Sequence, residues 1–193
     1  MSKPFFMDEA QIHRLITPVK KGDKVAFEML MDVCYGYVER LTVRILRKKE
    51  DAEEAIQNTF VKLWQSLQSY DEKQKFSTWL YRIAVNASLD ILRREQRFAG
   101  RREEMNRSEG KELTPPPDVV LLEKETEEVL RDLSGILTPK QRAVFVLRDL
   151  ERVPTEEVAE VLQMTSDQVK SNLYHARKKI REKIRNYDRK EYL

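Results

Sequence analysis

Residues 138–185 read TPKQRAVFVLRDLERVPTEEVAEVLQMTSDQVKSNLYHARKKIREKIR and contain three helix-start signals in succession. Thr138 is a capping threonine followed by proline at the first helical position and, three residues after the cap, by glutamine. Pro154 introduces a second, short helix. After a turn at Gln163, the capping pattern of threonine and glutamine repeats from Thr165. These intervals predict a unit of three helices in which the last two form a helix-turn-helix.

The last of these helices has a polar face suited to the major groove of duplex DNA. Its apolar positions, at steps of three and four, are Val169, Leu173, Ala176, Ile180 and Ile184. From residue 165 to residue 185 there are seven basic residues and two acidic ones. Hydroxyl, amide and cationic side chains bond to base edges and phosphates. The residues that we expect at the DNA are Thr165, Ser166, Asp167, Lys170, Ser171, Asn172, Tyr174, His175, Arg177 and Lys178. A solvated basic helix is the alternative, which the capped turn and the short helix before it disfavour.

The composition limits the class of protein. Of the 193 residues, 40% are hydrophobic and 36% are charged, but the net charge is only +3, so DNA binding is inferred from the clustering of charge and not from its total. The single cysteine, Cys34, excludes an internal disulfide framework and a zinc finger, and we expect it to be a buried apolar residue. Neither a signal peptide nor an apolar run of about 20 residues is present. We therefore expect a cytoplasmic protein with no membrane insertion.

The first half of the chain also shows helical spacing, and the scarcity of alternating β-branched stretches predicts an all-α fold. A short helix ends at Gly22, Asp23 caps a long one, acidic residues open a third at Glu50, and Ser77 is the predicted cap of a fourth. Their predicted buried residues are Ile12, Leu15, Ile16 and Val19; Phe27, Leu30, Met31, Cys34, Val38, Leu41 and Ile45; Ile56, Phe60, Leu63, Trp64 and Leu67; and Leu80, Ile83, Ala84, Ala87 and Ile91.

Helical periodicity stops after Arg97. Residues 98–120 are rich in charge and contain three consecutive prolines, so we expect a flexible linker there. Helical spacing resumes near Leu122. The sequence therefore predicts two small helical domains, residues 8–97 and 121–187, of which the second is a tri-helical or four-helix helix-turn-helix domain.

Two segments of the first domain resemble the second conserved region of bacterial RNA polymerase sigma factors: DAEEAIQNTFVKLW at 51–64 and FSTWLYRIAVN at 76–86. The segment from Leu137 to Ile184, which includes VKSNLYHARKKI at 169–180, resembles their fourth region. With only a short linker between the two, the chain is similar to the small extracytoplasmic-function (ECF) group. The resemblance implies a subunit that binds core RNA polymerase, directs it to promoter DNA and helps to melt that DNA.

In sigma factors the third helix docks on a coiled coil of the largest polymerase subunit. The resemblance therefore assigns polymerase binding to an acidic and amide-rich face made of Asp51, Glu54, Gln57 and Asn58. A solvated face is the alternative. Such exposed faces would also suit an anti-sigma protein, whose existence the sequence leaves open.

The fourth helix and the loop before it, residues 69–75, hold the melted downstream element as single-stranded DNA in this family. The residues to which the resemblance assigns this role are Thr78, Tyr81, Arg82, Asn86 and Arg93. Asn86 carries a donor and an acceptor on one amide and is the candidate reader of a flipped base, while Arg82 and Arg93 would hold backbone. Trp79 is expected in the core, and for Tyr81 core and stacking roles stay open.

Some residues depart from the family pattern. Gln163 occupies a turn position that is often glycine, so we expect a negative φ or mild strain there. The loop at Val153 and Pro154 is stiffer than usual, and Asn172 and His175 stand where many members have arginine. These departures affect affinity and the sequence that is read more than docking.

Other functions fit less well. A two-domain transcription regulator that acts as a dimer is the runner-up, and self-association would distinguish it. An enzyme is weaker still, because the two histidines, His13 and His175, lie in different domains and no metal-ligand spacing or phosphate loop is present. No cofactor is expected.

Overall fold

The computed structural model describes residues 9–46, 48–109 and 136–188, and within them it is helical with no strand. The all-α prediction is confirmed. The elements in order are α1 (Glu9–Lys20), α2 (Lys24–Ile45), α3 (Lys49–Ser66), the 3-10 turn η1 (Leu67–Ser69), α4 (Phe76–Glu109), α6 (Pro139–Phe145), the π-helical turn η2 (Val146–Leu150), α7 (Thr155–Leu162) and α8 (Ser166–Asp188). We call residues 9–109 the N-terminal half and residues 136–188 the C-terminal half.

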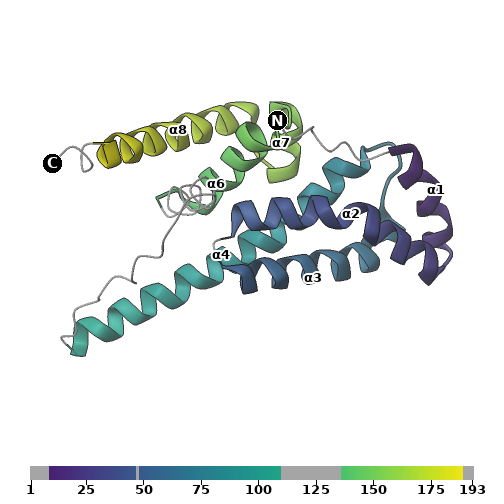
Figure 1. The fold of residues 1–193 in the computed structure, drawn as a ribbon, viewed down its shortest axis with the longest axis horizontal. Coiled ribbons are helices and arrows are strands. Elements are labelled where there is room, and N and C mark those ends of the chain that lie inside the picture. The colour runs from purple at the N-terminus through teal and green to yellow at the C-terminus, as the bar shows by residue number, and fades with distance from the viewer. Residues whose placement is uncertain (1–8, 47, 110–135, 189–193) are drawn as a thin grey trace.

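In the N-terminal half, α2, α3 and α4 pack side by side, and α1 covers one end of them (Figure 1). Gly22 has a φ of +90° and ends α1, as glycine does most readily. The Asp23 carboxylate accepts a hydrogen bond from the Ala26 N–H at 3.1 Å, which confirms the predicted cap of α2. Cys34 is fully buried, as expected.

Two local predictions in this half were wrong. Trp64 is 40% exposed because it lies at the edge of the core, where it meets the Phe27 ring at 4.7 Å. Helix α4 begins at Phe76, so Ser77 is not its cap. Phe76 is fully buried against Tyr70 at 5.5 Å between ring centroids, and this packing sets where the helix starts.

Helix α4 also continues past the predicted end of the first domain. It runs to Glu109, so residues 98–109 are helical where a linker was expected, and this part of α4 projects beyond α2 and α3 (Figure 1). The run RREE at 101–104 consists of good helix formers, which offset the cost of Gly100, about 1 kcal/mol relative to alanine. The rest of the predicted linker and the helical spacing from Leu122 to Leu133 lie outside the described residues.

The C-terminal half is the predicted tri-helical unit. Thr138 and Gln141 cap α6 reciprocally, as the sequence signal indicated. In α7 the buried residues are Val158 and Val161, and Leu162 is half-buried. In α8, Val169, Leu173 and Ala176 are buried, but Ile184 is 43% exposed. That prediction was wrong because α8 extends past α6 and α7, so its last turns have no cover from them (Figure 1).

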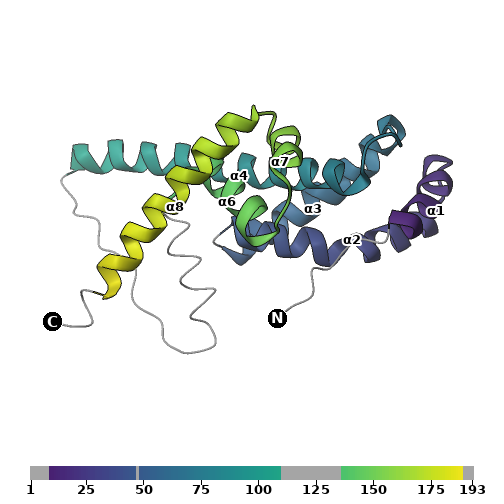
Figure 2. The same ribbon diagram turned by 90° about the horizontal axis from the view of Figure 1, so that it is seen from above.

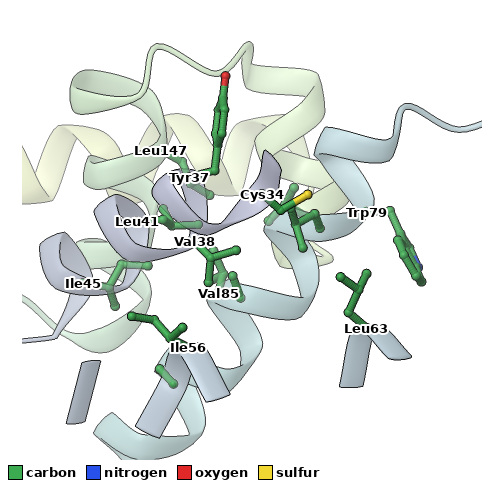
Figure 3. Close-up of a cluster of buried hydrophobic side chains, with 14 of the residues drawn as sticks. Cys34, Tyr37, Val38, Leu41, Ile45, Ile56, Leu63, Trp79, Val85 and Leu147 are labelled. Atoms are coloured by element: carbon green, nitrogen blue, oxygen red, sulfur yellow. The ribbon is translucent and has the colours of Figure 1, made fainter. Parts of the chain in front are cut away.

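The two halves share one core. Helices α6 and α7 pack on α4, and η2 packs on α2, while α8 lies on the outer side (Figures 1 and 2). Leu147 of η2 lies beside Tyr37 and Leu41 of α2 (Figure 3). Arg142 is 6% exposed, and its Nη1 donates to the carbonyl oxygen of Ile45 at 2.9 Å. A buried charge bonded across two segments ties them closely. None of the helices in the described ranges is long and apolar enough to cross a membrane.

Candidate nucleic-acid interface

Helix α8 presents its polar face outward, on the side away from α6 and α7. Eight of the ten residues predicted at duplex DNA are exposed, and Ser166 and Asn172 are half-buried. Tyr174 is 64% exposed, and its ring meets that of His175 edge-on at 5.4 Å. An aromatic tip among cations on a free helical face can approach both sugar and base edges.

Two side chains of this face are already bonded within the protein. The Arg177 guanidinium makes a bidentate pair with Asp149 of η2, at 2.8 and 2.6 Å, and this pairing raises the pKa of Arg177. The Asn172 amide donates to the Gln168 carbonyl oxygen of its own helix at 2.8 Å. Ser171, His175 and Lys178 are therefore better placed than Asn172 and Arg177 to meet a base or phosphate.

The turn between α7 and α8 fixes the angle of α8. Gln163 adopts φ +51° and ψ +52°, so of the two alternatives the negative φ is wrong and the strained, left-handed backbone is observed. The Met164 N–H donates to the Ala159 carbonyl oxygen at 2.9 Å, which closes α7. Thr165 then accepts from the Gln168 N–H at 3.2 Å, and the Gln168 side chain accepts from the Thr165 N–H at 3.0 Å. The predicted capping box is confirmed.

A groove between α3 and α4 gathers two of the five residues predicted for melted DNA. Arg82 and Asn86 line it, and its volume is about 310 Å³. The other lining residues are Lys62, Gln65, Ser66 and Ile83. Asn86 is exposed, so its amide is available to a base. The α3 residues of this groove were missed in the sequence, although their spacing of three and four from Asn58 was a signal.

Arg93 lies farther along α4 on the same face. Its guanidinium pairs with Asp90 at 3.1 Å, and Asp90 also lies 3.8 Å from Lys62 of α3. All three side chains are more than 45% exposed, so this pairing is weak and leaves Arg93 able to exchange its partner for a phosphate.

Thr78 and Tyr81 are not on the open groove, because α7 covers them. Thr78 is 4% exposed, and its hydroxyl donates to the Glu157 carboxylate of α7 at 3.3 Å. Tyr81 is half-buried beneath the C-terminal half. Burial, then the nearby carboxylate of Glu151, raises the pKa of the Tyr81 phenol. The structure therefore splits the predicted single-strand site into an open part and a covered part. Trp79 is 7% exposed within the aromatic cluster of Tyr70 and Phe76, which confirms its core role.

The predicted polymerase-binding face of α3 is also divided. Glu54 makes a bidentate pair with Arg94 of α4 at 2.8 and 2.6 Å, and this pair lowers the pKa of Glu54. Asp51 lies 3.9 Å from Lys48 and beside Glu95, and burial followed by that second carboxylate raises the pKa of Asp51. These two carboxylates thus position α4, while Gln57 and Asn58, nearer the middle of the helix, are exposed, and Asn58 also bonds to Glu54.

Gln57 and Asn58 are exposed in the middle of α3. Val61 is 53% exposed and Trp64 is 40% exposed, at steps of three and four from those amides, so the same face continues as an apolar patch. Trp64 was predicted to be in the core, and Val61 was not predicted at this surface. An exposed aromatic beside amides is typical of protein-docking surfaces.

An exposed basic face on α8, an open polar groove between α3 and α4 and an exposed patch of amide and apolar side chains on α3 are typical of an all-helical DNA-binding transcription factor. Two family models match the chain: Sigma-70 region 2 over residues 30–98 and Sigma-70, region 4 over residues 127–180. The ECF RNA polymerase sigma-E factor of Escherichia coli K12 is 30% identical over 182 residues, which are 88% of this chain and 92% of that protein. The ECF RNA polymerase sigma factor SigW of Bacillus subtilis is 28% identical over 185 residues, 92% of this chain and 99% of that protein.

Two solved structures have the same fold. CnrH, in complex with the cytosolic domain of CnrY, superposes with a TM-score of 0.65 at 22% identity and covers 93% of this chain and 99% of its own. The sigma factor RpoE of Bartonella quintana, in complex with the anti-sigma factor NepR, gives a TM-score of 0.59 at 19% identity over 82% of this chain and 96% of its own. The chain belongs to the ECF sigma factors of RNA polymerase. It is a sigma factor, the initiation subunit by which RNA polymerase is directed to promoters.

Proposed function

We propose that this sigma factor docks on core RNA polymerase through the middle of α3. The docking surface consists of Gln57, Asn58, Val61 and Trp64, with Asp51 and Glu54 at its end. The apolar centre of such a surface is buried on binding, while the amides and carboxylates at its margin fix the register of the complex and attract a basic partner. Because polymerase and promoter are cytoplasmic in bacteria, we place its action in the cytoplasm.

We propose further that the factor reads two promoter elements in different states. The exposed face of α8 reads the upstream element as duplex, with Ser171, His175 and Lys178 at the groove. The groove of Arg82 and Asn86 captures one base of the downstream element after melting, since an amide can bond to a Watson–Crick edge and a guanidinium can hold the adjoining phosphate. The observation that carries this proposal is the presence of two open polar surfaces on separate halves of one chain.

Simultaneous reading requires the two halves to separate. We propose residues 8–97 and 121–187 as the two functional domains, with the projecting end of α4 as part of their connection. The shared core is then present in the free factor, before it binds polymerase. An anti-sigma protein is a further expected partner, as the solved relative from Bartonella quintana has one.

The test is assembly followed by transcription. The chain is mixed with core polymerase, and native mass spectrometry counts the subunits, while run-off transcription follows initiation on supercoiled templates. We expect one copy per polymerase and promoter-dependent transcripts. Trp64→Asp should abolish both, whereas Val43→Asp, at a residue of α2 that is similarly exposed (43%), should abolish neither. A self-associating chain that ignores core polymerase would contradict the proposal and indicate the dimeric regulator.

A further inference from the structure

Two carboxylates of the C-terminal half reach basic residues of the N-terminal half. Glu151, just after η2, pairs with Arg40 and Arg44 of α2. Glu157 of α7 pairs with Lys75 at 2.5 Å and accepts from Thr78. All of these contacts join residues more than 75 positions apart in the chain, so they exist only while the halves are together.

The Glu151 carboxylate is enclosed by its partners. Its side chain is 7% exposed, and both of its oxygens lie 3.3 Å from Nε of Arg40, while Arg44 bonds to one of them. The Arg40 guanidinium also lies over the Tyr37 ring, 5.0 Å from its centroid. The two arginines are four residues apart on α2, and like charges at that spacing repel each other. With Glu151 gone, the two adjacent cations would lose the carboxylate to which both of them bond.

The same surface continues along α4 toward the open groove. Lys75 and Thr78 precede Arg82 by less than two helical turns, and Thr78, Arg82 and Asn86 follow one another at steps of four. Tyr81 of α4 lies near both acidic contacts, since burial and then the charges of Glu151 and Glu157 raise its pKa. The basic residues therefore lie on the side of the N-terminal half that η2 and α7 cover, and α4 continues from there to the groove.

We propose that Arg40, Arg44 and Lys75 form a backbone-binding track for single-stranded promoter DNA, which Glu151 and Glu157 occupy in the closed chain in place of phosphates. The proposal rests on the proposed function, because the track extends the groove assigned there to the melted strand. Guanidinium and ammonium groups bind carboxylate and phosphate oxygens alike, so either can fill the same positions.

Two tyrosines favour a single strand over a duplex as the ligand. Tyr37 and Tyr81 lie beneath η2 and α7, and Figure 3 shows Tyr37 projecting from α2 toward the C-terminal helices. Separation of the halves would expose both rings beside the cations. Bases stack on such rings only when they are unpaired, and phosphates then follow the neighbouring cations.

The test compares two double variants of the full chain by fluorescence anisotropy with a short, labelled single-stranded DNA of mixed sequence. Glu151→Gln with Glu157→Gln should bind this DNA several-fold more tightly than the unaltered chain. Arg40→Gln with Arg44→Gln breaks the ion pairs of Glu151 from the other side but should bind this DNA more weakly, with a salt slope lower by about 1.4, from 0.7 for each lost phosphate contact. Glu156→Gln and Arg14→Gln, both at exposed residues, are the matched controls.

The track is supported if the affinity for single-stranded DNA rises in the glutamate variant and falls in the arginine variant. If this affinity changes in the same direction in both variants, the ion pairs only hold the halves together, and the proposal is overturned. A second measurement in the holoenzyme covers the case in which the glutamate variant stays closed. Open complexes of the arginine variant should decay several-fold faster and with weaker salt dependence, whereas those of the glutamate variant should keep their lifetime. An arginine variant with unchanged lifetime and salt dependence overturns the proposal.

Failure of this proposal is distinguishable from failure of the proposed function. The unaltered holoenzyme is assayed for promoter-dependent transcripts in the same series. If those transcripts are absent, the proposed function fails. If they are present while the arginine variant behaves like Arg14→Gln, only the track is refuted.

Discussion

The Thr78 hydroxyl donates to the Glu157 carboxylate, 3.3 Å away, and so joins the first turns of α4 to α7. Thr78 is one of the residues predicted for melted DNA, and it is 4% exposed in this arrangement. The closed chain therefore covers part of the predicted single-strand site, while α8 stays open to solvent. Use of both predicted DNA sites at once would thus require the two halves to separate.

The covered state of Tyr81 can be measured chemically. Nitration by tetranitromethane requires an accessible phenolate, and burial together with Glu151 raises the pKa of Tyr81, so that less phenolate forms. We expect Tyr81 to react much more slowly than Tyr174, which is 64% exposed, and to react faster in Glu157→Gln. Peptide mass spectrometry after timed exposure gives both rates. Equal rates for the two tyrosines in the unaltered chain would refute the cover.

Asn86→Ala tests the base-reading role of the α3–α4 groove. Loss of the amide removes the bonds that distinguish one flipped base, so preference at one downstream position should relax, by about 1–3 kcal/mol in discrimination. Run-off transcription on templates varied at each position measures this effect. Binding to core polymerase should be unaltered, since Asn86 is not part of the proposed docking surface on α3. Loss of core binding would remove Asn86 from the reader role.

Lys178→Ala tests the orientation of α8. A lysine at the phosphates contributes a uniform, salt-dependent part of affinity. Binding of upstream duplex by the holoenzyme should weaken for every sequence, and the salt slope should fall by about 1. Lys21→Ala, at an exposed lysine before α2, serves as the control and should change neither quantity. An unchanged slope for Lys178→Ala would place it outside the interface.

Gln163→Gly tests the strained turn. A side chain in the left-handed region costs about 1–2 kcal/mol, and glycine avoids that cost but loses more entropy on folding. We expect the free energy of unfolding to rise by up to about 1 kcal/mol, measured by urea denaturation. Duplex binding should be retained, because the angle between α7 and α8 stays the same. A destabilised variant would show that contacts of the Gln163 side chain outweigh the strain.

Much of the fold could be predicted because its signals are local. Capping residues such as Asp23, Thr138 and Thr165 act within one turn of themselves, and apolar spacing identifies the face that each helix buries. The same rules failed at Trp64 and Ile184, which have core spacing but lie where the neighbouring helices end. Periodicity identifies a face without showing how far a partner covers it.

The candidate site was predicted less completely, for a related reason. The residue types on α8 and the amide of Asn86 were visible from spacing. The pairing of Glu151 with Arg40 was not, because the two are 111 positions apart and sequence periodicity carries no information about such contacts. Likewise Thr78 and Tyr81 have suitable chemistry, yet the packing of α7 decides whether they are accessible.

We propose above that one chain directs RNA polymerase to a promoter through two readers on its two halves. The reconstituted holoenzyme can be used to select promoter DNA from a random pool, with transcription as the selecting step. Two enriched elements at one fixed separation are expected, and the downstream element should overlap the melted region. If the pool yields a single palindromic element, or no element that core polymerase alone does not also enrich, the chain does not read promoters in this way.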